Sequence, residues 1–151
     1  MAHEFIEHLL EDHEEQRQMG EEIRHAMDLD ERKELWEEFY EELSGHLLGE
    51  EASIFPFLQE VGGETTMEAD KALQEHHVAK LLIRELQDVS MDGDTWLAKV
   101  KVLDDMNRVH IDAEERIHFP KLVQLCTPDQ LDDLFEQYEE AEEEAEEEET
   151  I

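Results

Sequence analysis

The stretch HIDAEERIHFP, residues 110–120, has a near copy in HLLGEEASIFP, residues 46–56. Both follow the pattern H-x-x-x-E-E-x-x-x-F-P. A histidine and a glutamate four residues apart share one face of a helix, with their Cβ atoms roughly 5–6 Å apart. Two such helices that face each other would direct two imidazoles and two carboxylates at one interior point. The repeat therefore predicts a metal site inside a helical protein.

The charge of the chain limits its partners. Its 151 residues include 12 Lys and Arg against 45 Asp and Glu, which gives a formal net charge of −33. Such a charge argues against nucleic acid and against anionic membrane surfaces as partners, because both require a basic surface. No basic segment leads into an apolar one, and no apolar run reaches about 18 residues. We therefore expect a soluble, cytoplasmic protein. The single cysteine, Cys126, excludes an internal disulfide and a thiolate metal cluster.

Helical periodicity extends through most of the chain, without the alternation of apolar and polar residues that is typical of strands. Five amphipathic segments cover residues 3–27, 28–61, 65–89, 95–125 and 127 onward. Four long segments with short connections predict an all-α, up-down-up-down four-helix bundle, closed by a short fifth C-terminal helix and an acidic tail. We assign residues 1–126 to the bundle and residues 127–151 to the C-terminal helix with its Glu-rich tail. That tail is expected to be a solvated or frayed helix.

Local signals predict where the helices begin and bend. Residues 28–31 and 65–68 have the spacing of capping sequences, and Pro128 occupies the first helical position after Thr127. The two repeats end in Pro56 and Pro120. Because proline cannot donate the backbone hydrogen bond of a helix, kinks are expected at matching places on both helices.

The two His–Glu pairs interrupt the apolar stripes of their helices. His46 and Glu50 follow the stripe of the second segment, and His110 and Glu114 follow that of the fourth. A buried carboxylate is costly unless it is paired or bound to a metal. Few Lys or Arg residues lie on these stripes, so a metal ion is the partner that we expect.

The first and third segments each add one histidine. His13 lies on the inner side of its helix, and His76 belongs to an apolar stripe, whereas the adjacent His77 belongs to a largely charged side. We therefore expect His76 to face the site and His77 to lie at the surface or beside a ligand. Glu51 and Glu115 turn away by about 100° and are expected beside the ligands or in solvent. The predicted ligands are His13, His46, Glu50, His76, His110 and Glu114. The histidines that lack this pattern are His3, His8, His25 and His118.

The ligand types indicate the metal. Four imidazoles and two carboxylates are too many for one tetrahedral zinc ion, and imidazoles disfavour calcium and magnesium. They suit two iron ions that share bridging carboxylates, whereas manganese or zinc fits less well. A single inward histidine is more often a hydrogen-bonded core residue, and one His–Glu pair is often an ordinary helix-surface pair. Two identical pairs together with two more inward histidines favour the metal site.

At these residues the chain resembles the hemerythrin family, in its HHE cation-binding branch. The matching segments are LLEDH at 9–13, EHHV at 75–78 and the two repeats, in family order. The resemblance implies a four-helix bundle with a non-haem di-iron centre, in which Glu50 and Glu114 match the bridging carboxylates and the four histidines match the other ligands. Oxygen carriers of the family have a further histidine one turn before the third-segment ligand, and here that position is Ala72. This departure argues against reversible oxygen carriage.

Members of this family bind dioxygen, or sense or scavenge oxygen, nitric oxide or iron. The resemblance thus implies a di-iron protein that binds O2, NO or a related small molecule for sensing, storage or scavenging. The alternatives are a di-iron oxidoreductase of the peroxidase or NO-reducing type, and an iron-responsive interaction domain without catalysis. No catalytic residue is assigned, and a binding protein is expected rather than an enzyme. A protein partner could use the acidic tail. A ferritin-like centre would instead use Glu-x-x-His motifs, the reverse order at another spacing.

Overall fold

The chain folds as a bundle of helices in a computed structural model that describes residues 2–148. Its elements are α1 (Glu4–Arg24), α2 (Leu29–Ala52), α3 (Ile54–Gln59), α4 (Gly63–Asp88), α5 (Asp94–Ala113), the π-helical turn η1 (Glu114–His118), α6 (Phe119–Leu125) and α7 (Pro128–Glu148). Residues 2–148 contain no strand, and the all-α prediction is confirmed. No helix within this range is long and apolar enough to cross a membrane.

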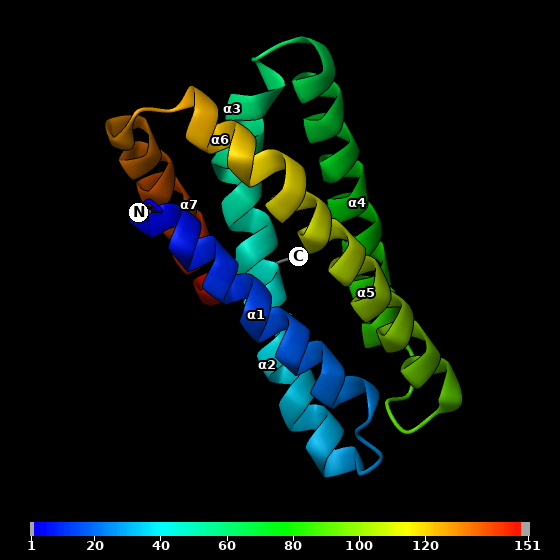
Figure 1. Cartoon of the computed structure of the whole chain (residues 1–151). Coiled ribbons are helices and arrows are strands. Elements are labelled where there is room, and N and C mark those ends of the chain that lie inside the picture. The colour runs from blue at the N-terminus through cyan, green and yellow to red at the C-terminus, as the bar shows by residue number, and fades with distance from the viewer. Residues whose placement is uncertain (1, 149–151) are drawn as a thin grey trace.

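Four antiparallel rods form the bundle (Figure 1). Helix α1 packs against α2 and α5, and α4 packs against α5. The second rod continues from α2 into α3, and the fourth continues from α5 through η1 into α6. Short connections reverse the chain between successive rods, which gives the predicted up-down-up-down order. Helix α7 then folds back along α2.

The caps of α2 and α7 follow the sequence signals. Asp28 Oδ2 accepts a hydrogen bond from the backbone N–H of Glu31 at 3.1 Å. Before α7, Thr127 Oγ1 accepts from the N–H of Gln130 at 3.2 Å, while Gln130 Oε1 accepts from the N–H of Thr127 at 2.8 Å. This reciprocal pair is a capping box, and it fixes the point at which the chain turns from α6 into α7.

The cap predicted for α4 is wrong. The helix begins at Gly63, two residues before Thr65, and no side chain caps it. Gly62 and Gly63 have φ angles of +99° and +59°, a region that favours glycine, and they let the chain turn early. Thr66 Oγ1 instead accepts from the N–H of Gly62 at 2.8 Å and donates to the carbonyl of Gln59, so it ties α3 to α4.

Both proline-containing rods depart from α-helical geometry just before their prolines. Helix α2 ends at Ala52, and Ser53 has φ −128° and ψ −81° before α3 resumes. In the fourth rod the π-helical turn η1 ends directly before α6 and Pro120. A proline leaves the carbonyl four residues earlier without its helical donor, which accounts for a change of geometry on this side. The α-helical geometry is therefore interrupted at matching places in both rods.

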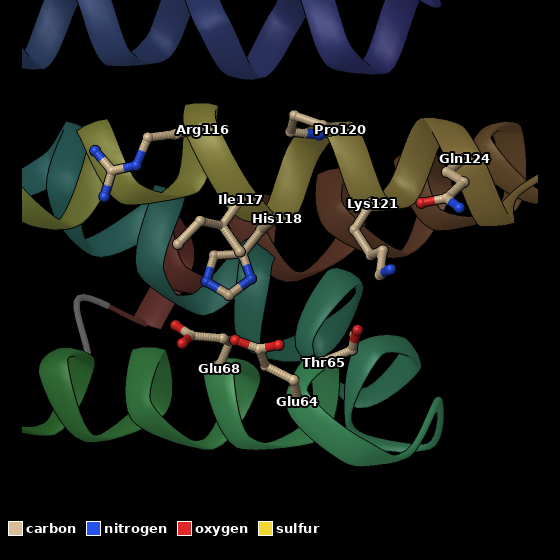
Figure 2. Close-up of a pocket in the computed structure, with 9 residues that line it drawn as sticks. All are labelled: Glu64, Thr65, Glu68, Arg116, Ile117, His118, Pro120, Lys121 and Gln124. Carbon is tan, nitrogen blue, oxygen red and sulfur yellow. The ribbon is translucent and has the colours of Figure 1, made fainter.

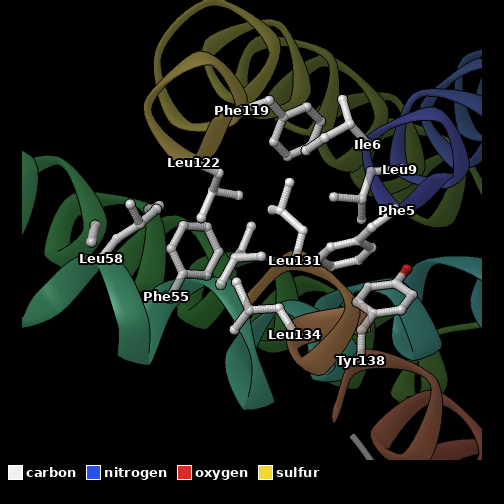
Figure 3. Packing of buried hydrophobic residues seen from close by; sticks show 13 residues of the cluster. Phe5, Ile6, Leu9, Phe55, Leu58, Phe119, Leu122, Leu131, Leu134 and Tyr138 are labelled. Atoms are coloured by element: carbon white, nitrogen blue, oxygen red, sulfur yellow. The ribbon is translucent and has the colours of Figure 1, made fainter. Parts of the chain in front are cut away.

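The hydrophobic core is divided into two clusters, one on each side of a polar layer. The proximal core packs against α7 and consists of Phe5, Ile6, Leu9, Ile54, Phe55, Leu58, Ala69, Ala72, Phe119, Leu122, Leu131, Leu134 and Tyr138 (Figure 3). The distal core lies toward the other end and consists of Ile23, Trp36, Phe39, Leu43, Leu47, Ile83, Leu86, Trp96, Val100 and Leu103. In α1, for example, Leu9 belongs to the first and Ile23 to the second, with His13 between them. The predicted ligands thus lie where the two clusters meet.

Helix α7 is longer than the short helix predicted from the sequence. It continues to Glu148 and includes most of the Glu-rich run, while residues 149–151 of the predicted tail lie outside the described part. Tyr138 is fully buried and Ala145 is nearly so. Contact with α2 therefore gives this acidic helix an apolar side to bury, which local charge repulsion alone would not predict.

Candidate metal centre

All six predicted ligands lie together in the interior of the bundle. Their exposed fractions range from 0 to 4 %. The set is distributed over four rods: His13 from α1, His46 and Glu50 from α2, His76 from α4, His110 from α5 and Glu114 from η1. His77 is exposed, as its charged helix side predicts.

The first group of potential ligands consists of His13, His46, Glu50 and Glu114, with one ligand atom from each lying within 4.8 Å of the others. Nε2 of His13 is 3.4 Å from Glu114 Oε1. Nε2 of His46 is 3.2 Å from Glu50 Oε2 and 4.0 Å from Glu114 Oε1. Two imidazoles and two carboxylates therefore converge on one point between α1, α2 and η1.

The second group consists of Glu50, His76 and His110, which meet the same criterion. Nε2 of His76 is 3.2 Å from Glu50 Oε1, and Nε2 of His110 is 3.2 Å from Glu114 Oε1. The two oxygens of Glu50 thus face different groups, since Oε2 faces His46 and Oε1 faces His76. Glu114 Oε1 likewise contacts His13 and His110. Both carboxylates occupy positions suited to bridging two ions.

A metal ion fits this donor set because the inner atoms lack other partners. Six buried atoms of this set have no hydrogen-bond partner among the described residues: Nε2 of His13 and His46, and both carboxylate oxygens of Glu50 and Glu114. Leaving a buried polar atom unsatisfied costs about 1–3 kcal/mol, and more when it is charged. Nε2 of His76 and Nε2 of His110 are 3.0 Å apart, within hydrogen-bond distance of each other, and a metal ion bound by both would replace this contact. Imidazole nitrogen and carboxylate oxygen suit iron, manganese or zinc.

The outer nitrogens of the four histidines are held by other side chains. Three Nδ1 atoms lie beside carboxylates, at 2.8 Å for His13 with Glu115, 3.0 Å for His76 with Glu51 and 2.9 Å for His110 with Glu75. The fourth, Nδ1 of His46, is 2.8 Å from the hydroxyl of Tyr138 and 3.2 Å from Asp12 Oδ2. In each case an Nδ1–H that donates outward leaves the lone pair of Nε2 facing the centre, as metal-ligating histidines require.

Electrostatics favours positive charge at this point. Burial by itself opposes ionisation of Glu114, but the imidazoles of His110 and His13 outweigh it and lower the pKa of that carboxyl well below its usual range. Burial likewise opposes protonation of His110, yet Glu114 raises its pKa well above the usual value. Without another cation, protons on the imidazoles would neutralise the carboxylates. A metal ion would take over that role.

Sequence reasoning found the six inward residues and missed several of their partners. Glu51 and Glu115 were expected beside the ligands or in solvent, and each holds a histidine of another helix. Glu75, Asp12 and Tyr138 were not expected to touch the site. Glu75 directly precedes His76 but contacts His110, so its position on the helix gave no signal.

Two cavities lie beside the fourth rod, and one of them reaches the predicted ligands. A cavity of about 590 Å³ lies between α4 and the η1–α6 segment, and His118 and Glu68 line it (Figure 2). His118 is 4 % exposed and its ring lies 5.4 Å from that of Phe55, but it belongs to neither ligand group. A second cavity of about 260 Å³ reaches His76 and His110 and has an apolar lining that includes Leu47, Ala79, Met106 and Val109.

Comparisons with known proteins give the family and the fold of the chain. The family model for the Hemerythrin HHE cation binding domain matches residues 4–122. An uncharacterized hemerythrin-like protein of Schizosaccharomyces pombe is 27 % identical over 115 residues. The match covers 76 % of this chain and 57 % of that protein, so the chain spans little more than half the length of this relative. The crystal structure of a Hemerythrin HHE cation binding domain-containing protein from Mycobacterium kansasii has the same fold, with a TM-score of 0.76, 23 % identity, and coverage of 95 % of this chain and 87 % of that one. With four histidines and two glutamates gathered inside such a bundle, the chain belongs to the hemerythrin family of HHE cation-binding domains.

Proposed function

We propose that the protein holds a non-haem di-iron centre that binds dioxygen, nitric oxide or a related small molecule. The observation that carries the proposal is the pair of buried ligand groups that share Glu50 and leave six inner donor atoms without hydrogen bonds. Each group contributes two imidazoles, and the two carboxylates lie between the groups. Two ions that share carboxylates would satisfy all six atoms, whereas one ion would satisfy a single group.

The apolar cavity beside the second group favours an uncharged ligand. It reaches His76 and His110 through a lining that includes Leu47 and Val109. Ala72, where oxygen carriers of the family have a further histidine, packs in the proximal core and offers no donor. The second position would therefore have two imidazoles and would keep room for a small molecule. Ferrous iron supplies the electrons that allow a di-iron centre to bind diatomic gases.

Side chains of the chain set the charge, the ligand orientation and the dryness of the proposed centre. Glu50 and Glu114 balance the charge of the ions, and the four histidines direct Nε2 inward because their Nδ1–H groups are held outside. The proximal and distal cores on either side exclude water, which strengthens every electrostatic contact at the centre. The same arrangement slows the leakage of protons to bound ligands.

Reconstitution with ferrous iron in the absence of air tests the proposal. We expect two iron ions per chain by elemental analysis. On admission of dioxygen or nitric oxide, a stable and reversible visible band is expected. Rapid bleaching with consumption of added peroxide would instead favour the oxidoreductase alternative. If iron changes helicity and melting temperature but neither gas changes the spectrum, the interaction-domain alternative gains.

Substitutions in the two groups test the ligand assignment separately. His46→Ala removes an imidazole of the first group and His110→Ala one of the second, and each is expected to lower the iron content. The matched control is His77→Ala, because His77 is exposed and adjacent to His76 on the same helix. It should retain two ions per chain. Unchanged iron content in both His46→Ala and His110→Ala would show that the site has been assigned wrongly.

A further inference from the structure

Tyr138 is the side chain from α7 that contacts the Nδ1 atom of a predicted histidine ligand; the other three histidines are held by carboxylates of other helices. Its side chain is fully buried, and its hydroxyl lies 2.8 Å from Nδ1 of His46. The same hydroxyl donates to Asp12 Oδ2 at 2.7 Å. Helix α7 begins at Pro128, beyond residues 4–122 that match the family model. A residue outside the matched domain thus touches a predicted ligand.

The carboxylate of Asp12, which can only accept, sets the direction of this chain of hydrogen bonds. The Tyr138 hydroxyl uses its only proton on Asp12, so its oxygen is free to accept the Nδ1–H of His46. That arrangement leaves the Nε2 lone pair of His46 facing Glu50, 3.2 Å away. Tyr138 at 2.8 Å, together with Asp12 Oδ2 at 3.2 Å from the same Nδ1, therefore selects the tautomer of His46 that can bind a metal ion.

Packing holds the ring of Tyr138 in this position. The ring lies 5.5 Å from that of Phe5 and meets the His46 ring edge-on at 5.9 Å. The carboxylates that hold the other three histidines are partly exposed, with side-chain exposures of 24–30 %. Solvent reaches those carboxylates, but it has little access to the buried hydroxyl of Tyr138. The outer contact of His46 is thus the most enclosed of the four.

We propose that Tyr138 is a positioning residue for one of the two metal ions, the one bound by the first group. The inference rests on the proposed function, because it requires two metal positions. Tyr138 contacts His46 alone among the predicted ligands, so its hydroxyl acts on the first group and leaves His76 and His110 to their own partners. Loss of a comparable hydrogen bond to a metal-ligating histidine typically costs 10–100-fold in metal affinity.

The test compares Tyr138→Phe with Glu75→Ala in the full chain. Tyr138→Phe removes only the hydroxyl that contacts His46 of the first group. Glu75→Ala removes the carboxylate that contacts His110 of the second group. Each protein is loaded anaerobically with ferrous iron and mixed with excess chelator, and release of the two ions is followed by absorbance. In Tyr138→Phe we expect one ion to leave about 10–100-fold faster and the other at the wild-type rate. Glu75→Ala should accelerate release of the other ion, and the double variant should accelerate release of both.

Further measurements separate this role from a merely structural one. The metal-free variants are compared by melting temperature, since a general loosening of the fold would accelerate both ions together. Asp12→Asn keeps an oxygen that accepts from Tyr138, and it should release iron more slowly than Tyr138→Phe. Equal acceleration of both ions, unchanged release, or acceleration of the same ion by Tyr138→Phe and Glu75→Ala would overturn the inference. If the wild type binds fewer than two ions, the proposed function fails and the inference fails with it; if the wild type binds two and Tyr138→Phe changes nothing, the inference alone fails.

Discussion

The ring of Tyr138 lies directly against the backbone of Gly49. A β-carbon at position 49 would be 2.6 Å from both Cδ2 and Cε2 of that ring, well inside van der Waals contact. Helix α7 can approach α2 this closely only because residue 49 is glycine. The approach brings the Tyr138 hydroxyl to His46, one turn earlier on α2. A glycine thus links the docking of α7 to the candidate metal centre.

Gly49→Ala should destabilise the protein even though alanine favours helix. Overpacking typically costs about 1–3 kcal/mol, while the gain in helix propensity is at most about 1 kcal/mol. Urea unfolding should therefore show a lower midpoint. Gly45→Ala is the matched control on the same helix, because its β-carbon would be 3.1 Å from Cγ of Glu142, a flexible side chain that can move. Equal effects of the two substitutions would contradict the close contact between Gly49 and Tyr138.

Removal of residues 127–151 should abolish cooperative folding, although the sequence suggests that residues 1–126 form the bundle. Leu131, Leu134 and Tyr138 belong to the proximal core, and without them Phe5 and Leu9 would lose much of their cover. Circular dichroism during heating measures the transition. In the full chain, Leu131→Ala should cost about 2–5 kcal/mol, which is a milder perturbation of the same contact. A fragment of residues 1–126 that melts like the full chain would instead support the division into two parts.

Glu42→Gln should stabilise the protein at neutral and alkaline pH. Burial, together with the nearby carboxylate of Asp12, raises the pKa of Glu42 to about 8 from an ordinary value of 4.5. Between these pH values the folded state holds a proton that the unfolded state lacks, so stability falls as the pH rises through this window. The substitution removes that loss. We expect a gain of about 1–2 kcal/mol near pH 8, less than full linkage would give because solvent screens part of the side chain.

The pH dependence of that gain is the decisive feature. Chemical denaturation at several pH values should show it shrinking toward zero below pH 4.5, where the unfolded state also binds the proton. Glu34→Gln on the exposed side of α2 removes the same charge without burial. A gain that is equal for both variants, or independent of pH, would indicate relief of net charge rather than a buried carboxyl.

Arg32→Leu should destabilise the end of the bundle far from α7. Arg32 is 5 % exposed, and its guanidinium donates to the carbonyls of Ala26 at 2.6 Å and Met91 at 2.8 Å. These bonds tie the α1–α2 connection to the α4–α5 connection. Hydrogen bonds of a charged donor are worth about 1.5–3 kcal/mol each, so a loss of about 2–4 kcal/mol in unfolding free energy is expected. Lys33→Ala, at an exposed position next to it, should change stability by no more than about 0.5 kcal/mol.

The inward residues of the centre could be predicted from the sequence because helix periodicity is local. Once a segment is helical, the face on which His46 and Glu50 lie follows from their spacing, whatever packs against it. The same reasoning distinguished His76 from His77. It could not place the start of α4, because the positive φ angles of Gly62 and Gly63 are a property of the turn rather than of helix periodicity.

The chain by itself therefore determined four amphipathic rods and the six side chains that they direct inward. Only the tertiary structure decided what holds those side chains from outside. Tyr138 is 92 residues from His46, and Glu75 contacts His110 across two helices. Such contacts depend on how far each helix is rotated and how closely it approaches its neighbour, and the packing of the whole core sets both. Gly49 and Tyr138 illustrate the difference, because Tyr138 contacts His46 only when α7 packs against α2 at Gly49.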